Sequence, residues 1–294
     1  MTFLHDLLRF PFLQYAVLAG ALAAVAAGVV GSLVVVRRTT YLAGAISHCV
    51  LAGLGLARYL QRACGVEWFT PMLGAALAAV AAAALISWLT VRYRQRTDTA
   101  LSMVWAVGMA IGVSFLAATP GYQDDLMSYL FGSLLLVDPS ELAVMAGLDV
   151  LVLALVGLFY NQLLAIGFHA DHARLRGVRV ALFETGFLMV TALTVVLLVK
   201  VSGIVLALAL LTLPAATAGL LVRRLVPMMA VSAGICFVVT TGGLALSYGP
   251  EWPPGATIVE VAAAAYLLAA GVRHVRGMMA QRFQRASTGN PGDR

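Results

Sequence analysis

Long apolar stretches alternate with short polar joins along almost the whole chain. Each stretch has the length of about 20 residues that an α-helix needs to cross a hydrocarbon core of ~30 Å. Only three residues separate two of them, so eight spans are an alternative to nine. The pattern predicts an all-α bundle of membrane-spanning helices. The nine stretches are 13–36, 42–60, 72–91, 99–118, 141–161, 179–199, 203–222, 228–247 and 256–272.

The distribution of arginine predicts the orientation of these spans. Most arginines lie in the joins at 37–38, 92–96, 174–179 and 223–224, and after residue 272. The alternate joins carry few basic residues. Because Lys and Arg gather in short loops on the cytoplasmic side, the N-terminus is expected outside and the C-terminus in the cytoplasm.

Composition supports a membrane protein. The chain is 62% hydrophobic and 11% charged, whereas roughly a quarter of a soluble domain is charged. Its net charge of +6 lies mainly in the joins and the C-terminal segment, so we expect no nucleic-acid partner. We predict an interfacial segment (1–12), a transmembrane domain (13–272) and a cytoplasmic tail (273–294).

Two features of the spans concern transport. No G-x-x-x-x-G-K-[ST] phosphate loop occurs, so we expect that the chain is not an enzyme and binds no cofactor. If it is a pump, its energy would come from ATP hydrolysis by a partner chain or from an ion gradient. Pro214 interrupts an uncharged span next to several small residues. This predicts a kinked helix packed inside the bundle.

Ionisable residues inside apolar spans are the candidates for chemistry, because they are costly there and often functional. His48 is the main one, since a neutral imidazole binds first-row metals. The alternative is a structural histidine that hydrogen-bonds Ser47 or a backbone carbonyl. Asp149 and Glu260 could line a path, or form an internal ion pair or stay protonated.

Two joins could contact partners. The arginine-rich join 162–178 holds a helical pattern, Asp171–Arg176, which ends at Gly177, a residue typical of helix C-termini. Such a helix could dock in a partner's groove, although spacing alone favours a solvated loop. On the other side, acids in and just after 119–140 could attract cations or dock a binding protein. They are Asp124, Asp125, Asp138 and Glu141.

Several stretches, taken in order, match the pattern of a known family. They are FPFLQYAVLAG (10–20), RRTTYLAGAISHCVLAGLGLA (37–57), YLFGSLLLVDPSEL (129–142), FHADHARLRGV (168–178), LALLTLPAATAGLL (208–221) and PPGATIVEVAAAAYLL (253–268). Together they resemble the membrane subunit of ATP-binding-cassette importers of the zinc/manganese/iron permease family, and the likeness covers about residues 10–272.

The resemblance implies a type II importer fold in the bacterial cytoplasmic membrane. It implies a homodimer that imports a divalent zinc, manganese or iron ion, with an ATP-binding-cassette subunit that hydrolyses ATP and an extracytoplasmic metal-binding protein. The alternative is a stand-alone ion-coupled transporter that uses Asp149, Glu260 and Lys200. Residues 168–178 correspond to the segment that couples to the ATPase, with Asp171, Ala173, Arg174 and Gly177 in the matching places.

The resemblance also implies that His48 contacts the metal. Many family members carry Gly-Asp-Ala-x-Ser-His, with Asp and His one turn apart. This chain has Ala-Gly-Ala-Ile-Ser-His at 43–48, so Gly44 stands in the acidic position. Two copies of His48 near a two-fold axis would supply two nitrogens. Ser47, Asp149 and Glu260 are possible further groups of the path.

Overall fold

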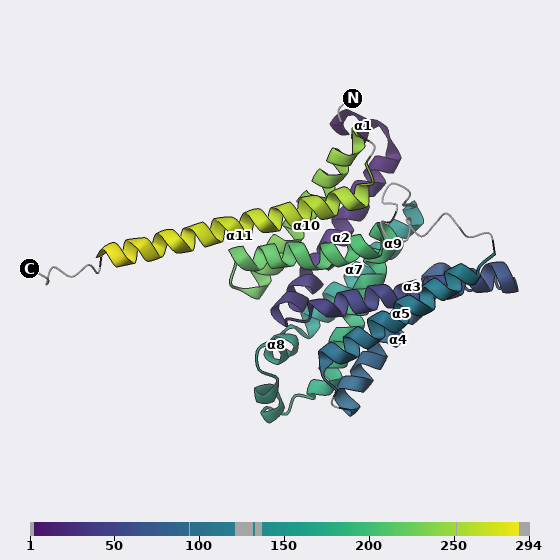
Figure 1. The fold of residues 1–294 in the computed structure, drawn as a ribbon, viewed down its shortest axis with the longest axis horizontal. Coiled ribbons are helices and arrows are strands. Elements are labelled where there is room, and N and C mark those ends of the chain that lie inside the picture. The colour runs from purple at the N-terminus through teal and green to yellow at the C-terminus, as the bar shows by residue number, and fades with distance from the viewer. Residues whose placement is uncertain (1–2, 94, 121–131, 133–136, 251, 288–294) are drawn as a thin grey trace, which may run out of the picture.

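The computed structural model describes residues 3–93, 95–120, 132, 137–250 and 252–287, and within these ranges the secondary structure is helical. The helices follow one another in a bundle (Figure 1). They are α1 (Phe3–Arg9), α2 (Pro11–Val36), α3 (Thr40–Cys64), α4 (Pro71–Arg92), α5 (Thr97–Ala118), α7 (Pro139–Leu158), α8 (Tyr160–Leu175), α9 (Val180–Leu221), α10 (Leu225–Tyr248) and α11 (Pro254–Ser287).

The nine-span prediction is confirmed over the eight-span alternative. Within the described residues, nine helical segments are long and apolar enough to cross a membrane, and α9 supplies two of them, Val180–Val199 and Ser202–Leu221. The others are α2, α3, α4, α5, α7, α10 and the first part of α11. Each begins and ends within a few residues of its predicted range because Pro, Gly and Arg mark most of the ends.

The interruption within α9 lies at Gly203. This residue has φ 75° and ψ 171°, a conformation that glycine adopts readily and residues with a Cβ do not. This position confirms the join predicted between the spans 179–199 and 203–222, whereas the kink predicted at Pro214 is absent, because the backbone there keeps helical dihedrals. Gly132 packs directly against Ser202 and Gly203, where a side chain in place of its hydrogen would collide with the backbone. The break is therefore fixed by two glycines in contact.

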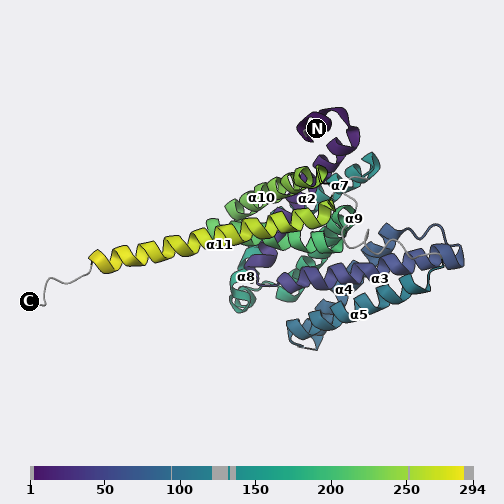
Figure 2. The same cartoon turned by 45° about the horizontal axis from the view of Figure 1, so that its top comes forward.

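Helix α9 is the centre of the bundle. It packs against α2, α3, α4, α7, α8, α10 and α11. Helices α3, α4 and α5 lie together on one side of it, and α10 and α11 on another (Figures 1 and 2). Gly53 of α3 and Gly74 of α4 face each other so closely that a Cβ on either would collide with the other's carbonyl oxygen. Small residues thus set the helix spacing, as is common in membrane bundles.

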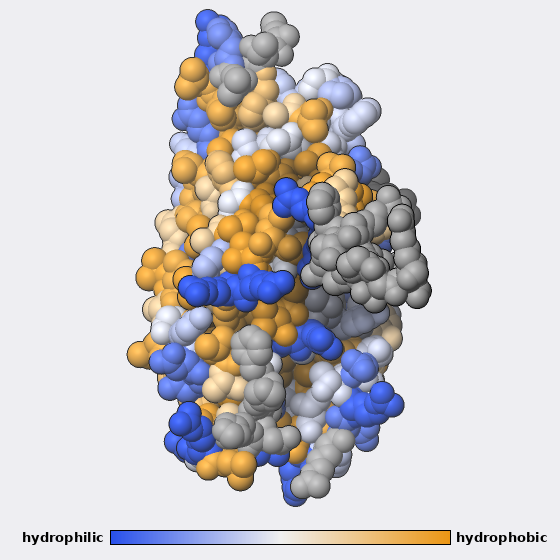
Figure 3. All heavy atoms as spheres, turned by 90° about the vertical axis from the view of Figure 1, so that its left-hand side faces the viewer, coloured by the Kyte–Doolittle hydropathy of each residue, from blue (hydrophilic) through white to orange (hydrophobic). Residues whose placement is uncertain are grey.

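The outer surface of the bundle is suited to lipid. Large apolar side chains such as Leu77, Val150, Val238 and Leu268 are exposed on different helices. Hydrophobic residues cover much of the face in Figure 3. A soluble monomer rarely exposes so much contiguous apolar surface.

Both ends of the chain extend the membrane domain. At the N-terminus, Tyr248 at the end of α10 donates a hydrogen bond of 3.2 Å to the carboxylate of Asp6 in α1. At the C-terminus, α11 does not stop at residue 272 as predicted for its span but continues as one helix to Ser287, projecting past the other helices (Figures 1 and 2).

Candidate metal path and coupling segment

His48 lies at the crossing of α3 and α5. Its ring stacks on the indole of Trp105, with the two ring centroids 4.7 Å apart and an interplanar angle of 17°. One residue further, the Cys49 thiol donates a hydrogen bond of 3.2 Å to the carbonyl of Val104. Gly108 lies against Cys49 so closely that a Cβ on it would collide with the cysteine sulfur. The two helices are therefore in tight contact around the histidine.

The polar atoms of the site have few partners. Nδ1 of His48 and the hydroxyl of Ser47 are buried, and neither has a hydrogen-bond partner in the described part of the protein. The hydrogen bond to Ser47 or to a backbone carbonyl, which a structural histidine was expected to make, is therefore not formed by Nδ1 in the described part of the protein. Its ring is held by Trp105 instead. A buried imidazole nitrogen without a partner is unusual, because most buried polar atoms are paired.

A single copy of the chain does not provide a full set of metal ligands among its described residues. No group of three or more His, Cys, Asp and Glu side chains comes together there. A stable first-row metal site usually has four or more ligands. Further ligands at His48 would have to come from water, from small polar groups or from a second copy of the chain.

The two carboxylates proposed for the path, those of Asp149 and Glu260, lie away from His48. Asp149 is only 4% exposed on α7, which packs against α2 and α9, and both of its carboxylate oxygens lack a partner among the described residues. Glu260 is exposed on α11. Neither lies at the α3–α5 crossing that holds His48. The side chain of Lys200, the third group of the alternative transporter, lies outside the described residues.

The predicted coupling segment is the end of α8 and the turn that follows. Gly177 has φ 80°, and its N–H donates to the carbonyl of Arg174 at 3.0 Å. The N–H of Val178 donates to the carbonyl of Ala173 at 3.1 Å. These two bonds form a Schellman motif, which requires a left-handed residue at the position of Gly177. The prediction that Gly177 caps this helix is confirmed.

The coupling segment has an inner and an outer side. Ala173 is 3% exposed and packs with Ile166 and Val180. Leu175, in contrast, is 86% exposed, and Arg174 is exposed beside it. The exposed side of this segment therefore carries residues 174–177, while Ala173 packs the helix against α9. The side chain of Asp171 lies outside the described residues.

Arg37 contacts both α8 and the membrane helix α9. Its guanidinium carbon lies 4.3 Å from the ring centroid of Phe187 in α9, a cation–π contact. Gly167 of α8 lies beside its aliphatic stem. Burial lowers the pKa of Arg37, and the nearby carboxylate of Glu184 raises it; an arginine stays charged in either case. Since Arg37 ends α2 and closely precedes α3, it connects α8 and α9 to the helix that carries His48.

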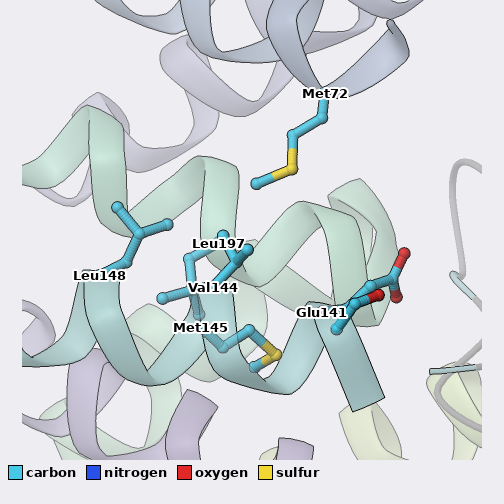
Figure 4. A pocket seen from close by; sticks show the side chains of 7 residues that line it. Met72, Glu141, Val144, Met145, Leu148 and Leu197 are labelled. Carbon is cyan, nitrogen blue, oxygen red and sulfur yellow. The ribbon is translucent and has the colours of Figure 1, made fainter. Parts of the chain in front are cut away.

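A pocket of about 210 Å³ opens between α4 and α7, near the first turn of each helix. Met72 reaches from α4 toward Leu197, and Glu141 lies at the side of the pocket (Figure 4). Glu141, one of the acids predicted to attract cations, lines this pocket. Asp124 and Asp125 lie outside the described residues.

Sequence reasoning missed Trp105, Leu175 and Arg37 as parts of the site. Trp105 had a detectable signal, because tryptophan in membrane proteins is enriched at the interfaces and this one lies inside a span. The exposure of Leu175 and the contact between Arg37 and Phe187 depend on how α8 and α9 pack, which no local pattern records.

Sequence comparisons place these features among known proteins. The sequence profile described as the ABC 3 transport family matches residues 9–273. An uncharacterized membrane protein of Synechocystis sp. is 39% identical over 266 residues, which cover 90% of this chain and 92% of the relative. The manganese transport system membrane protein MntC of Listeria monocytogenes is 31% identical over 269 residues, covering 92% and 93%.

A solved structure has the same fold. A chain of PsaBC from Streptococcus pneumoniae, determined in complex with Fab, superimposes with a TM-score of 0.78 and 27% sequence identity. The match covers 91% of this chain and 94% of that chain. The similarity thus extends over nearly all of the helices described above.

Proposed function

The chain belongs to the ABC 3 transport family, and we propose that it is the membrane-spanning subunit of an ATP-driven importer for divalent transition metal ions. The cargo is zinc, manganese or iron, and ATP is hydrolysed by a separate cytoplasmic subunit. The protein works in the bacterial cytoplasmic membrane, with its N-terminus outside and its C-terminus inside. The manganese transport role in the name of the Listeria relative supports a metal cargo.

The observation that carries the proposal is His48. It is an imidazole inside a membrane span, with a buried nitrogen that has no hydrogen-bond partner among the described residues. Burying an unpaired polar group inside a membrane span costs free energy, and residues that carry this cost are often functional. Two copies of the chain, related by a two-fold axis, would bring two imidazoles to one path. Water and small groups such as Ser47 would complete a weak shell, which suits an ion that must leave again.

The coupling proposal uses the exposed end of α8. Arg174, Leu175 and Gly177 dock in a groove of the ATPase, and closure of the ATPase dimer moves α8. Arg37 passes the movement on, because it touches α8 at Gly167 and α9 at Phe187. Because a short loop links Arg37 to α3, the movement is then transmitted to the helix that carries His48. An extracytoplasmic metal-binding protein delivers the ion at the other end.

Uptake by the reconstituted complex tests this function. The chain and its ATPase are placed in proteoliposomes with the binding protein loaded with Zn²⁺, Mn²⁺ or Fe²⁺, and metal inside the vesicles is measured. We expect ATP-dependent accumulation of at least one of these ions, and none with ADP. Accumulation driven by a proton gradient, by this chain without the ATPase, would contradict the proposal and favour a secondary transporter.

A further inference from the structure

Trp105 touches both His48 and the glycine one turn before it. Besides stacking on the imidazole, its indole lies where a side chain at residue 44 would begin. A Cβ on Gly44 would be 3.0 Å from Cζ3 and 3.3 Å from Cη2 of Trp105. The contacts of Cys49 with Val104 and Gly108 fix α5 beside this point. The indole therefore fills the volume beside His48.

We propose that Trp105 is a specificity-determining residue that makes this path prefer a borderline, nitrogen-seeking cation such as Zn²⁺ over the harder Mn²⁺. The inference rests on the proposed function, in which His48 contacts the transported ion. It goes further, because it assigns the choice of ion to a residue that does not bind the ion itself.

The preference follows from the ligands that the indole excludes. Residues four apart on a helix lie on the same face, so a carboxylate at residue 44 would project beside His48. The ring of Trp105 occupies that place, and its nitrogen is only a donor, so it offers no lone pair to a metal. Imidazole suits zinc, whereas carboxylate and water suit manganese. A site with nitrogen from His48 and no carboxylate from α3 disfavours Mn²⁺.

Trp105 also orients the ligand. A metal-bound histidine normally donates a hydrogen bond from its other ring nitrogen, and this bond fixes the ring. Nδ1 of His48 is buried without a hydrogen-bond partner in the described residues. Stacking on Trp105 at 4.7 Å takes over the orienting role. Phenylalanine at residue 105 should keep much of this role, and alanine should lose it.

The selectivity of the complete transporter tests the proposal. Uptake of Zn²⁺ and Mn²⁺ is measured for the parent, Trp105→Phe, Trp105→Ala and the double variant Gly44→Asp/Trp105→Ala. We expect the Zn²⁺/Mn²⁺ uptake ratio to stay near the parent value in Trp105→Phe and to fall about tenfold or more in the double variant, the scale on which changes near a ligand alter metal affinity. An unchanged ratio in the double variant contradicts the role of Trp105. It does so without touching the proposed function, which His48 variants test separately.

Fluorescence gives a second readout that does not depend on the double variant folding. The parent complex is titrated with Co²⁺, a paramagnetic substitute for Zn²⁺, and tryptophan emission is recorded. The chain has four tryptophans, so the signal of Trp105 is the difference between the parent and Trp105→Phe. We expect Co²⁺ to quench this difference signal, and His48→Ala to abolish the quenching. A difference signal that Co²⁺ leaves unchanged in a complex that imports Zn²⁺ overturns the inference.

Discussion

The imidazole of His48 lies nearly parallel to the indole of Trp105, although the two residues belong to different helices, α3 and α5. Most metal-binding histidines are oriented by a hydrogen bond within a polar network. Here an aromatic face on a neighbouring helix supports the ring. The setting of His48 therefore depends on how α5 sits against α3, and movement of one helix along the other would change it.

The coupling surface predicts the effect of a charge at Leu175. Leu175→Glu places a carboxylate on a side chain that is 86% exposed, so the fold of the chain should not change. A groove shaped for an apolar tip would reject the charge, and metal transport and co-purification of the ATPase should both fall. The matched control is Gln95→Glu, which adds the same charge at another exposed loop position. Normal transport and assembly of Leu175→Glu would remove Leu175 from the interface.

Arg37 predicts a different kind of defect. Arg37→Ala removes the contact with Phe187 and the stem beside Gly167, while the exposed docking surface of α8 stays intact. The ATPase should still co-purify, but metal transported per ATP hydrolysed should decrease. Arg38→Ala removes an equal charge from the next, exposed residue and serves as the control. Equal transport per ATP in the two variants would show that Arg37 does not carry the coupling.

The proposed orientation can be checked with a native cysteine. Cys64 at the end of α3 is exposed, whereas Cys49 and Cys236 are buried. A membrane-impermeant maleimide should label Cys64 in spheroplasts, because the proposed orientation places it outside. In a Cys64→Ser background, Gln95→Cys should be labelled only after the membrane is opened. Labelling of Gln95→Cys in sealed spheroplasts would reverse the orientation.

The close approach of α3 and α4 predicts a loss of stability. Gly53→Val adds a side chain that would collide with the carbonyl of Gly74, so the helices must separate. Overpacking of this kind costs about 1–3 kcal/mol, which should lower the melting temperature in detergent. Gly147→Ala is the control, since a Cβ there meets nothing within 4 Å. Equal melting temperatures would mean that the α3–α4 contact is looser than described.

Much of the fold follows from the sequence because a membrane limits the choices. Only helices of about 20 residues satisfy their backbone hydrogen bonds within the hydrocarbon core. The length of the apolar stretches therefore predicted all nine spans. The cap at Gly177 was predicted because glycine readily adopts the left-handed backbone conformation found at helix C-termini. The break in α9 lies at the predicted join between residues 199 and 203, whereas the kink expected at Pro214 is absent. The contact with Gly132 that fixes the break could not be predicted, because no local pattern in the sequence records it.

Only part of the candidate site could be predicted from the sequence. His48 could be identified because it is ionisable and lies in an apolar span. The partner on the other helix could not, because the contact with Trp105 depends on the rotation and spacing of α3 and α5, which Gly108 and Cys49 set through packing. For the same reason, Asp149 remained a candidate neighbour of His48 until the packing of α7 on α2 and α9 placed it elsewhere.

Metal uptake by His48→Phe tests the central claim most directly, with His48→Ala beside it. Phenylalanine keeps a ring that can stack on Trp105 but has no nitrogen to bind an ion, so it separates a ligand from a structural histidine. We predict that both variants lose ATP-driven uptake by about tenfold or more, while His48→Phe keeps the melting temperature and ATPase association of the parent. If His48→Phe imports Zn²⁺, Mn²⁺ and Fe²⁺ as the parent does, His48 is a packing residue and the proposed path is wrong.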